Sequence, residues 1–220
     1  EGFMLQVKNI LCDLVDYAYK DNPKLENYKR FYIEVSEQNR NTFHGDYNER
    51  THHIRIFNMY RNDAAIIATT IHELAHHIDT CNRGRSDHSK EFYTIFEHLL
   101  KTALNMGLFN KEQFFASTRD ASDSNKIRKM IENFDTVSVG YKDNVSVIRV
   151  KNCFDIKDDL KSRGYHYNSI EKSWELETSE ITLEEEFLKS VKVDIEYDIN
   201  NNYISFQKKT YICAVNGSFD

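Results

Sequence analysis

The sequence predicts an α+β fold, in which an N-terminal domain of three helices and a small antiparallel sheet precedes a small C-terminal α/β domain. Apolar residues recur at helical spacing in three long segments of the N-terminal half. Between the first two of these segments, two short stretches alternate apolar and polar residues, as strands do. In the last third of the chain, strand patterns and helix patterns take turns. We expect a domain over residues 1–107, a connector over 108–143 and a second domain over 144–220.

The first predicted helix covers residues 3–20 and ends at 21–23, where Asp-Asn-Pro stops it because proline cannot continue a helix. Strand patterns follow around residues 31–35 and 52–56. Asparagine, aspartate and glycine are concentrated over residues 39–46, and these residue types favour turns. The region therefore predicts a meander of two or three antiparallel strands.

The second predicted helix runs from about residue 63 to residue 80, and Gly84 lies in the loop that ends it. A third helix follows, with Ser86 or Asp87 expected as its N-cap. The second helix carries one continuous apolar stripe, which should face the core. This stripe consists of Ile67, Ile71, Leu74 and Ile78.

The remainder of the chain is predicted in shorter pieces. Residues 108–135 are polar and helical in parts, with a break over 120–125. Beyond this connector the pattern predicts two helices among several strands. The helices cover 155–163 and 183–191, and the strands cover 145–150, 165–167, 173–176, 193–197 and 203–206.

Composition limits the classes of protein that this chain can belong to. At 220 residues, with 40% hydrophobic and 29% charged residues, it can bury a core without help. No run of about 18 apolar residues and no signal-like start is present, so we expect a cytoplasmic location and no membrane partner. Four widely spaced cysteines predict neither a disulfide framework nor a zinc ribbon. The net charge of −6 does not support a broad nucleic-acid surface.

Eight of the nine histidines lie between positions 44 and 98, and two of them form a metal-binding pattern. His72 and His76 are four residues apart on the predicted helix, so both imidazoles project from one side. Glu73 lies about 100° further round the helix than His72, where a carboxylate can reach a metal-activated water without ligating the metal. The pattern can arise by chance in a histidine-rich chain. Its position at the edge of the apolar stripe favours a metal site.

A catalytic zinc site needs a third protein ligand, and three residues compete for this role. His77 lies about 100° round from His76 and cannot easily join the pair. Asp79 returns to nearly the same helical face as His72 and can ligate the metal or hold a histidine. His88 follows a short loop and approaches from a different direction, which suits a tetrahedron better. We expect His88 to be the third ligand and Asp79 to be the second choice.

These residues resemble those of the SprT-like metalloproteases. Residues 72–76 have the sequence HELAH, and residues 88–92 have the sequence HSKEF after a glycine-containing loop. The family pattern is HELxH followed by HGxx and an aromatic residue. Residues 43–47 and 54–58 also resemble the strand pair that precedes the zinc helix in that family. The resemblance covers about residues 1–106 and implies a zincin-type fold.

The resemblance implies that zinc is bound by His72, His76 and His88, and that Glu73 is the catalytic glutamate. Ser89 departs from the family pattern, which has glycine there, and the chain lacks the cysteine zinc ribbon that often accompanies these domains. The expected function is therefore hydrolysis of peptide bonds in a protein or peptide substrate by a zinc-activated water. Nucleic acid is a conceivable partner that the charge does not support.

Two alternatives to a general protease remain open at the level of sequence. The zinc can be structural in an interaction or regulatory module, or the enzyme can be a phage or mobile-element protease that cleaves one dedicated repressor. In both cases the C-terminal domain would provide recruitment. Further interpretations concern single residues: Tyr47, His77 and Arg85 as oxyanion donors, and Tyr165, Tyr167 and Trp174 as either an aromatic binding face or core.

Overall fold

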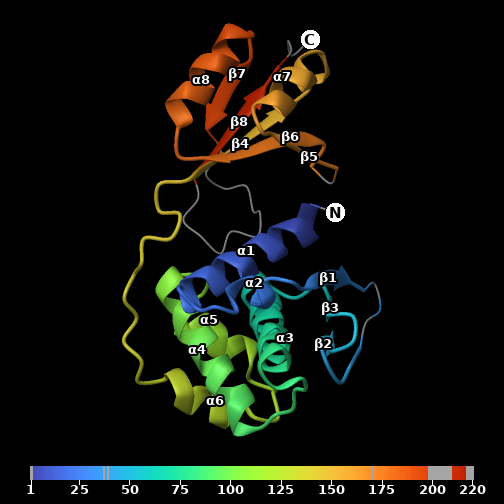
Figure 1. The fold of residues 1–220 in the computed structure, drawn as a ribbon. Helices are drawn as coiled ribbons and strands as arrows, with labels where there is room; N and C mark the ends of the chain where they lie inside the picture. Colours follow the sequence, from blue (N-terminus) through green and yellow to red (C-terminus); the bar gives the residue numbers. More distant parts are fainter. Residues whose placement is uncertain (1, 37, 39, 170, 198–209, 217–220) are drawn as a thin grey trace. The chain divides into compact units, whose positions relative to one another are not determined.

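The computed structural model describes residues 2–36, 38, 40–169, 171–197 and 210–216. These residues form two compact units, one from Phe3 to Tyr141 and the other from Lys142 onward (Figure 1). Both units combine helices with a small sheet, which agrees with the predicted α+β class. None of the helices in the described residues is both long enough and apolar enough to cross a membrane.

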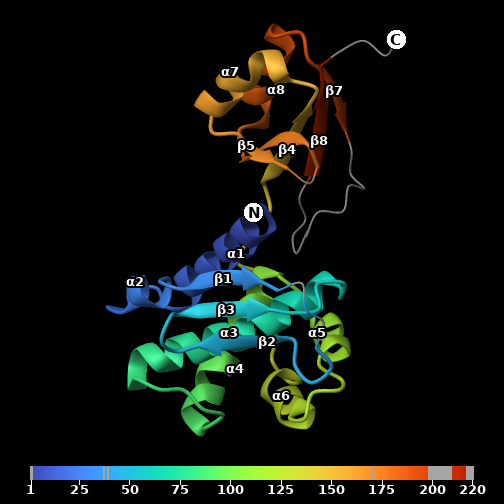
Figure 2. The same cartoon turned by 90° about the vertical axis from the view of Figure 1, so that its right-hand side faces the viewer.

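The first unit contains the three long helices that the sequence predicts. The helix α3 lies against the sheet and against α4 (Figure 2). Its predicted stripe is fully buried at Ile67, Ile71, Leu74 and Ile78. The elements of this unit are α1 (Gly2–Ala18), α2 (Leu25–Tyr28), β1 (Tyr32–Val35), β2 (Gly45–Asn48), β3 (His53–Ile56), α3 (Asp63–Arg83), α4 (Lys90–Met106), α5 (Lys111–Ser117) and α6 (Ser124–Ile131).

The sheet of the first unit is mixed, so the prediction of an antiparallel meander is wrong for one of its two pairings. The strand order is β1-β3-β2; β2 pairs antiparallel with β3, whereas β1 pairs parallel with β3. Only four residues join β2 to β3, which is a hairpin connection. Nine residues separate β1 from β2, enough for the chain to cross over and place β2 at the far edge.

The ends of α3 follow the local chemistry that the sequence indicates. The Asn62 side chain accepts a hydrogen bond from the backbone N–H of Ala65 and caps the first turn. At the other end, Gly84 adopts the left-handed conformation with φ of 75°. The helix α4 begins later than predicted, because its N-cap is Ser89 rather than Ser86 or Asp87.

Residues 108–141 belong to the first compact unit, which differs from the predicted separate connector over 108–143. The helix α5 packs on α3, and α6 packs on α4. Three apolar side chains, Phe114, Ile127 and Ile131, are buried and anchor these two short helices. The segment is polar overall because each helix buries only one narrow side.

The second unit is a five-stranded sheet with two helices on one face (Figure 1). Its core joins Leu160 and Leu188 from the helices to Ile148, Val150 and Ala214 of the central strands. The strand order is β5-β6-β4-β8-β7. The elements are β4 (Ser146–Lys151), η1 (Phe154–Ile156), α7 (Lys157–Ser162), β5 (His166–Asn168), β6 (Ser173–Thr178), α8 (Ile181–Ser190), β7 (Asp194–Tyr197) and β8 (Thr210–Val215).

The strand β8 was not predicted, although it lies inside the sheet and pairs parallel with β4. The predicted strand over 203–206 lies outside the described residues. The interpretation of three aromatic residues as a binding face is also revised. Tyr165 is buried in the core beside Glu184, and Trp174 packs partly against the same core, whereas Tyr167 is about half exposed.

A close approach between β2 and α3 depends on the absence of a side chain at Gly45. A Cβ atom at this position would lie 2.6 Å from Cγ2 of Thr69 and 3.2 Å from Cγ of Glu73. Real carbon atoms do not approach to 2.6 Å without displacement, so the strand or the helix would have to move. Gly45 therefore sets the distance between the sheet edge and the helix.

We expect Gly45→Ala to destabilise the first unit by about 1–3 kcal/mol through overpacking. Circular dichroism in a urea titration measures this loss. Fluorescence of Trp174, the single tryptophan, reports the second unit separately and should not change. Thr69→Ser removes the clashing methyl group, so the double variant should regain part of the lost stability. Equal stability of Gly45→Ala and the parent chain would contradict the packing argument.

Candidate metal centre

Three histidine side chains from two segments converge at one point of the first unit. The Nε2 atom of His88 lies 3.1 Å from Nε2 of His72 and 3.2 Å from Nε2 of His76. His72 and His76 project from α3, and His88 lies in the loop just before α4. The structure thus brings together the three residues that the sequence singled out as ligands, and together they are able to hold a metal ion.

The two nitrogen separations that involve His88 fit a tetrahedral metal ion, and all three ligand atoms lie within 4.8 Å of one another. Zinc binds histidine nitrogen at about 2.0–2.1 Å, so two ligands at the tetrahedral angle have nitrogens about 3.3 Å apart. The observed separations of 3.1 and 3.2 Å are close to this value. Imidazole is also the nitrogen donor that zinc commonly uses in catalytic sites with three protein ligands. The donor set and its spacing therefore both suit zinc.

The aromatic ring of Phe92 underlies the whole histidine group. It stacks on His76 at a centroid distance of 4.2 Å and lies 5.0 Å from both His72 and His88. Phe92 is fully buried at the start of α4, so it joins the histidine group to the core. Its ring limits the positions available to the three imidazoles.

Burial keeps the two candidate ligands on α3, His72 and His76, uncharged near neutral pH. Desolvation, with smaller contributions from the neighbouring imidazoles, lowers the pKa of His72 to about 4 and that of His76 to about 3. A neutral imidazole offers a nitrogen lone pair, whereas a protonated one does not. Both side chains are therefore in the protonation state that a metal ion requires.

Glu73 lies on the side of α3 that faces β2. The side chain is 7% exposed, and burial followed by the charge of Asp46 raises its pKa to about 8. Gly45 of β2 lies directly against its Cγ atom. The carboxyl group is not one of the three converging ligands, as expected from its different angle on the helix.

Asp79 is not placed to be a ligand, although the sequence made it the second choice. Its buried carboxylate accepts two hydrogen bonds from Arg83, at 2.7 and 2.6 Å, and one from Ser86 at 2.8 Å. Burial alone would raise the pKa of Asp79, but the bonds from Arg83 and Ser86 outweigh it, and the pKa lies below its ordinary value. Asp79 therefore stays ionised, and it lies behind His76, outside the group of three converging histidines.

His77 faces away from the histidine group, as its angle on the helix predicts. Its Nε2 atom lies 3.1 Å from the carbonyl oxygen of Asn27, and its Nδ1 atom lies 2.9 Å from the hydroxyl of Tyr47. The same hydroxyl lies 2.7 Å from Nδ1 of His52. Tyr47 and His77 are thus hydrogen-bond partners of each other. Arg85 is exposed in the loop after α3. None of the three stands out as an oxyanion donor.

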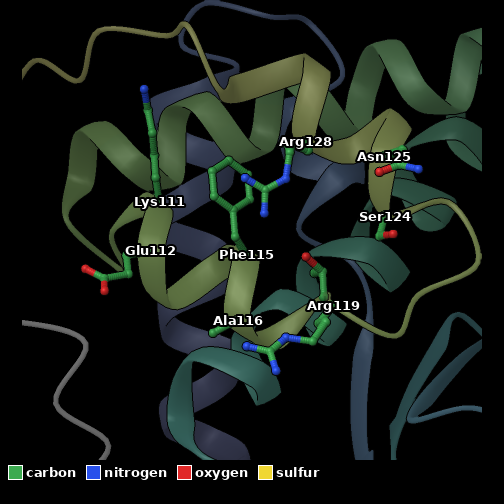
Figure 3. A pocket seen from close by; sticks show the side chains of 9 residues that line it. Lys111, Glu112, Phe115, Ala116, Arg119, Ser124, Asn125 and Arg128 are labelled. Atoms are coloured by element: carbon green, nitrogen blue, oxygen red, sulfur yellow. The ribbon is translucent and has the colours of Figure 1, made fainter.

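A separate open pocket of about 710 Å³ lies between α5 and α6 (Figure 3). Its charged lining consists of Lys111, Arg119 and Arg128 with one carboxylate, Glu112. The guanidinium of Arg128 covers the ring of Phe115 at 4.1 Å. This lining contains neither histidine nor cysteine.

Comparisons with known proteins do not add to this assignment. No protein-family model, curated protein or solved structure matches this chain.

Two contacts of the candidate site were not predicted from the sequence. They are the contact of Ser86 with His76 and the contact of Phe92 with all three histidines. The spacing of Asp79 and Arg83, four residues apart on a helix, was a signal for their ion pair.

We expect the chain to bind one zinc ion with a site that requires all three histidines. Alanine in place of His72, His76 or His88 should each abolish stoichiometric binding, because two imidazoles do not complete the site. Binding to the native state should also raise the thermal midpoint of the parent chain. Titration with zinc and metal analysis after gel filtration measure these effects.

His53→Gln is the matched control for this experiment, since His53 lies in β3 and stacks on Tyr32 rather than joining the group. It should bind zinc as the parent does. Full binding by His88→Ala would rule out the three-histidine site.

Proposed function

We propose that the chain is a zinc-dependent peptidase of the SprT-like type, with His72, His76 and His88 as ligands and Glu73 as general base. The observation that carries this proposal is the convergence of three imidazole nitrogens at metal-ligand spacing, with a buried carboxyl group one residue after the first of them. Nitrogen ligands also suit cobalt, nickel and iron, but a set of three histidines is a common ligand set of catalytic zinc.

The strand β2 supports a peptide as the substrate. It is the edge strand of its sheet, and no other strand in the described residues pairs with its outer side. The backbone N–H of Phe57 donates to the carbonyl of His44, so the alternation of an antiparallel ladder directs the peptide groups of Gly45 and Tyr47 outward. A free strand edge binds an extended peptide through backbone hydrogen bonds. Gly45 also lies beside Glu73.

The reaction requires a base that can take a proton from water and return it to the leaving amine. When bound, a zinc ion acts as a Lewis acid that lowers the pKa of water to about 7 and polarises a carbonyl group. Glu73 is suited to the proton transfers, because it is a buried carboxyl group one residue along α3 from the first proposed ligand. It would accept one proton from water at its carboxylate and donate it to the amine nitrogen as the peptide bond breaks.

The same proposal covers the role of the second unit and the location of the protein in the cell. We propose that the second unit recruits the substrate or a partner, and that the protein acts in the cytoplasm. Proteins and peptides are the proposed partners. The acidic balance, with a net charge of −6, gives no support to nucleic acid as a partner.

We expect Glu73→Gln to retain the metal and to lose peptidase activity by a factor of about 100 to 10,000, since the amide cannot accept the proton. Incubation of the zinc-loaded chain with a peptide library of mixed sequence, followed by mass spectrometry of new termini, measures cleavage. Glu91→Gln, at an exposed carboxylate in the first turn of α4, is the control and should cleave as the parent does.

Two results would argue against the proposed activity. Cleavage by Glu73→Gln at the parent rate would remove Glu73 from the mechanism. If the parent chain cleaves nothing and zinc removal unfolds the first unit, the metal is structural and the chain is a binding or regulatory module. Cleavage of one co-encoded repressor but not of the library would favour a dedicated protease.

A further inference from the structure

We propose that Arg83, Asp79 and Ser86 form a positioning cluster that fixes both His76 and the loop of His88, and thereby sets the affinity of the site for its metal ion. This inference rests on the proposed metal site and concerns residues that are not ligands themselves. The cluster begins at the imidazole of His76 and ends on either side of His88.

The first step is the orientation of His76. Its Nδ1 atom lies 2.7 Å from the hydroxyl oxygen of Ser86, and that hydroxyl lies 2.8 Å from a carboxylate oxygen of Asp79. An ionised carboxylate only accepts, so the single hydroxyl proton of Ser86 is donated to Asp79. The oxygen of Ser86 therefore accepts the Nδ1–H of His76. With its proton on Nδ1, His76 has its lone pair on Nε2, the atom that faces His88.

The second step is the anchoring of Asp79. Arg83, one turn further along α3, donates from Nε to one carboxylate oxygen at 2.7 Å and from Nη2 to the other at 2.6 Å. Such a two-point contact fixes the plane of the carboxylate as well as its position. Asp79 is 1% exposed, so little water competes for these bonds. The acceptor that orients Ser86 is thus held rigidly by the same helix that carries His76.

The third step connects the same guanidinium to the loop of His88. Nη2 of Arg83 also lies 2.9 Å from a carboxylate oxygen of Asp87 and 3.1 Å from the hydroxyl oxygen of Ser89, so its two hydrogens are shared among Asp79, Asp87 and Ser89. These two residues flank His88 directly. A further bond runs from the backbone N–H of Ser86 to the carboxylate of Glu49, at 2.9 Å. One arginine therefore ties the ligand helix to both neighbours of the third ligand.

Two features indicate that this cluster serves the site and not only stability. Ser89 is the N-cap residue of α4, yet its side chain makes no capping hydrogen bond and instead accepts from Arg83. A capping serine usually contributes about 1 kcal/mol to its helix. Asp79 also buries a charge, which is a weak way to stabilise a fold. Both features are explained if the cluster orients metal ligands.

The test is Ser86→Ala, which removes the acceptor of His76 Nδ1–H and leaves the ion pair of Asp79 with Arg83. We expect the dissociation constant for zinc, measured by competition with a chelator, to rise by a factor of about 10 to 100. The metal-free chain should keep its circular dichroism spectrum and thermal midpoint. Ser86→Thr keeps the hydroxyl and should restore affinity, and Ser138→Ala, a serine in the exposed segment after α6, should have no effect.

Nitrogen NMR of the metal-free chain gives a second, independent measurement. The proton of His76 should reside on Nδ1 in the parent and in Ser86→Thr, and it should be shared between both nitrogens in Ser86→Ala. Parent-like affinity together with an unchanged tautomer in Ser86→Ala would overturn the positioning role while the metal site stands. A parent chain that binds no zinc at all would overturn the proposed function and this inference with it.

Discussion

The burial of the apolar stripe of α3 is the interaction on which the candidate site depends. Ile67, Ile71, Leu74 and Ile78 have no exposed surface, so the helix cannot rotate without losing about 1.5–3 kcal/mol for each side chain. This fixed rotation places His72 and His76 on the side that meets α4, where Phe92 lies beneath them. It also turns Glu73 and His77 toward β2. Packing energy thus fixes the direction of each polar side chain.

The spacing of contact residues along the strand β2 matches the spacing of their partners along the helix α3. Glu73 and His77 are four residues apart on the helix, which corresponds to about 6 Å, and Gly45 and Tyr47 are two residues apart on the strand, about 6.7 Å. Glu73 meets Gly45, and His77 meets Tyr47. The hydrogen bond of Tyr47 with His77 fixes the register between the two elements. The missing side chain of Gly45 then allows the strand edge to approach Glu73.

Sequence reasoning succeeded where one periodic signal determines the structure. The stripe of α3 and the left-handed Gly84 followed from spacing and residue type. The direction of β1 was not predictable in this way, because alternation identifies a strand but not the sense of its pairing. The anchors Phe114 and Ile127 are too few to give a periodic signal, so the segment was predicted as a connector that is helical in parts, whereas it belongs to the first unit. Contacts of a loop, such as Ser86 with His76, depend on the tertiary fold and are not encoded locally.

The arrangement of the three imidazoles has an electrostatic consequence that favours a cation. The Ser86 hydroxyl fixes the proton of His76 on Nδ1, so a bare lone pair faces Nε2 of His88 at 3.2 Å. His88 can donate one proton at most from this nitrogen, yet it also lies 3.1 Å from Nε2 of His72. One proton on His88 Nε2 therefore cannot give each of the two close contacts a full hydrogen bond. A divalent ion would accept all three lone pairs together, and this arrangement of donors is one reason why we propose a metal at this site.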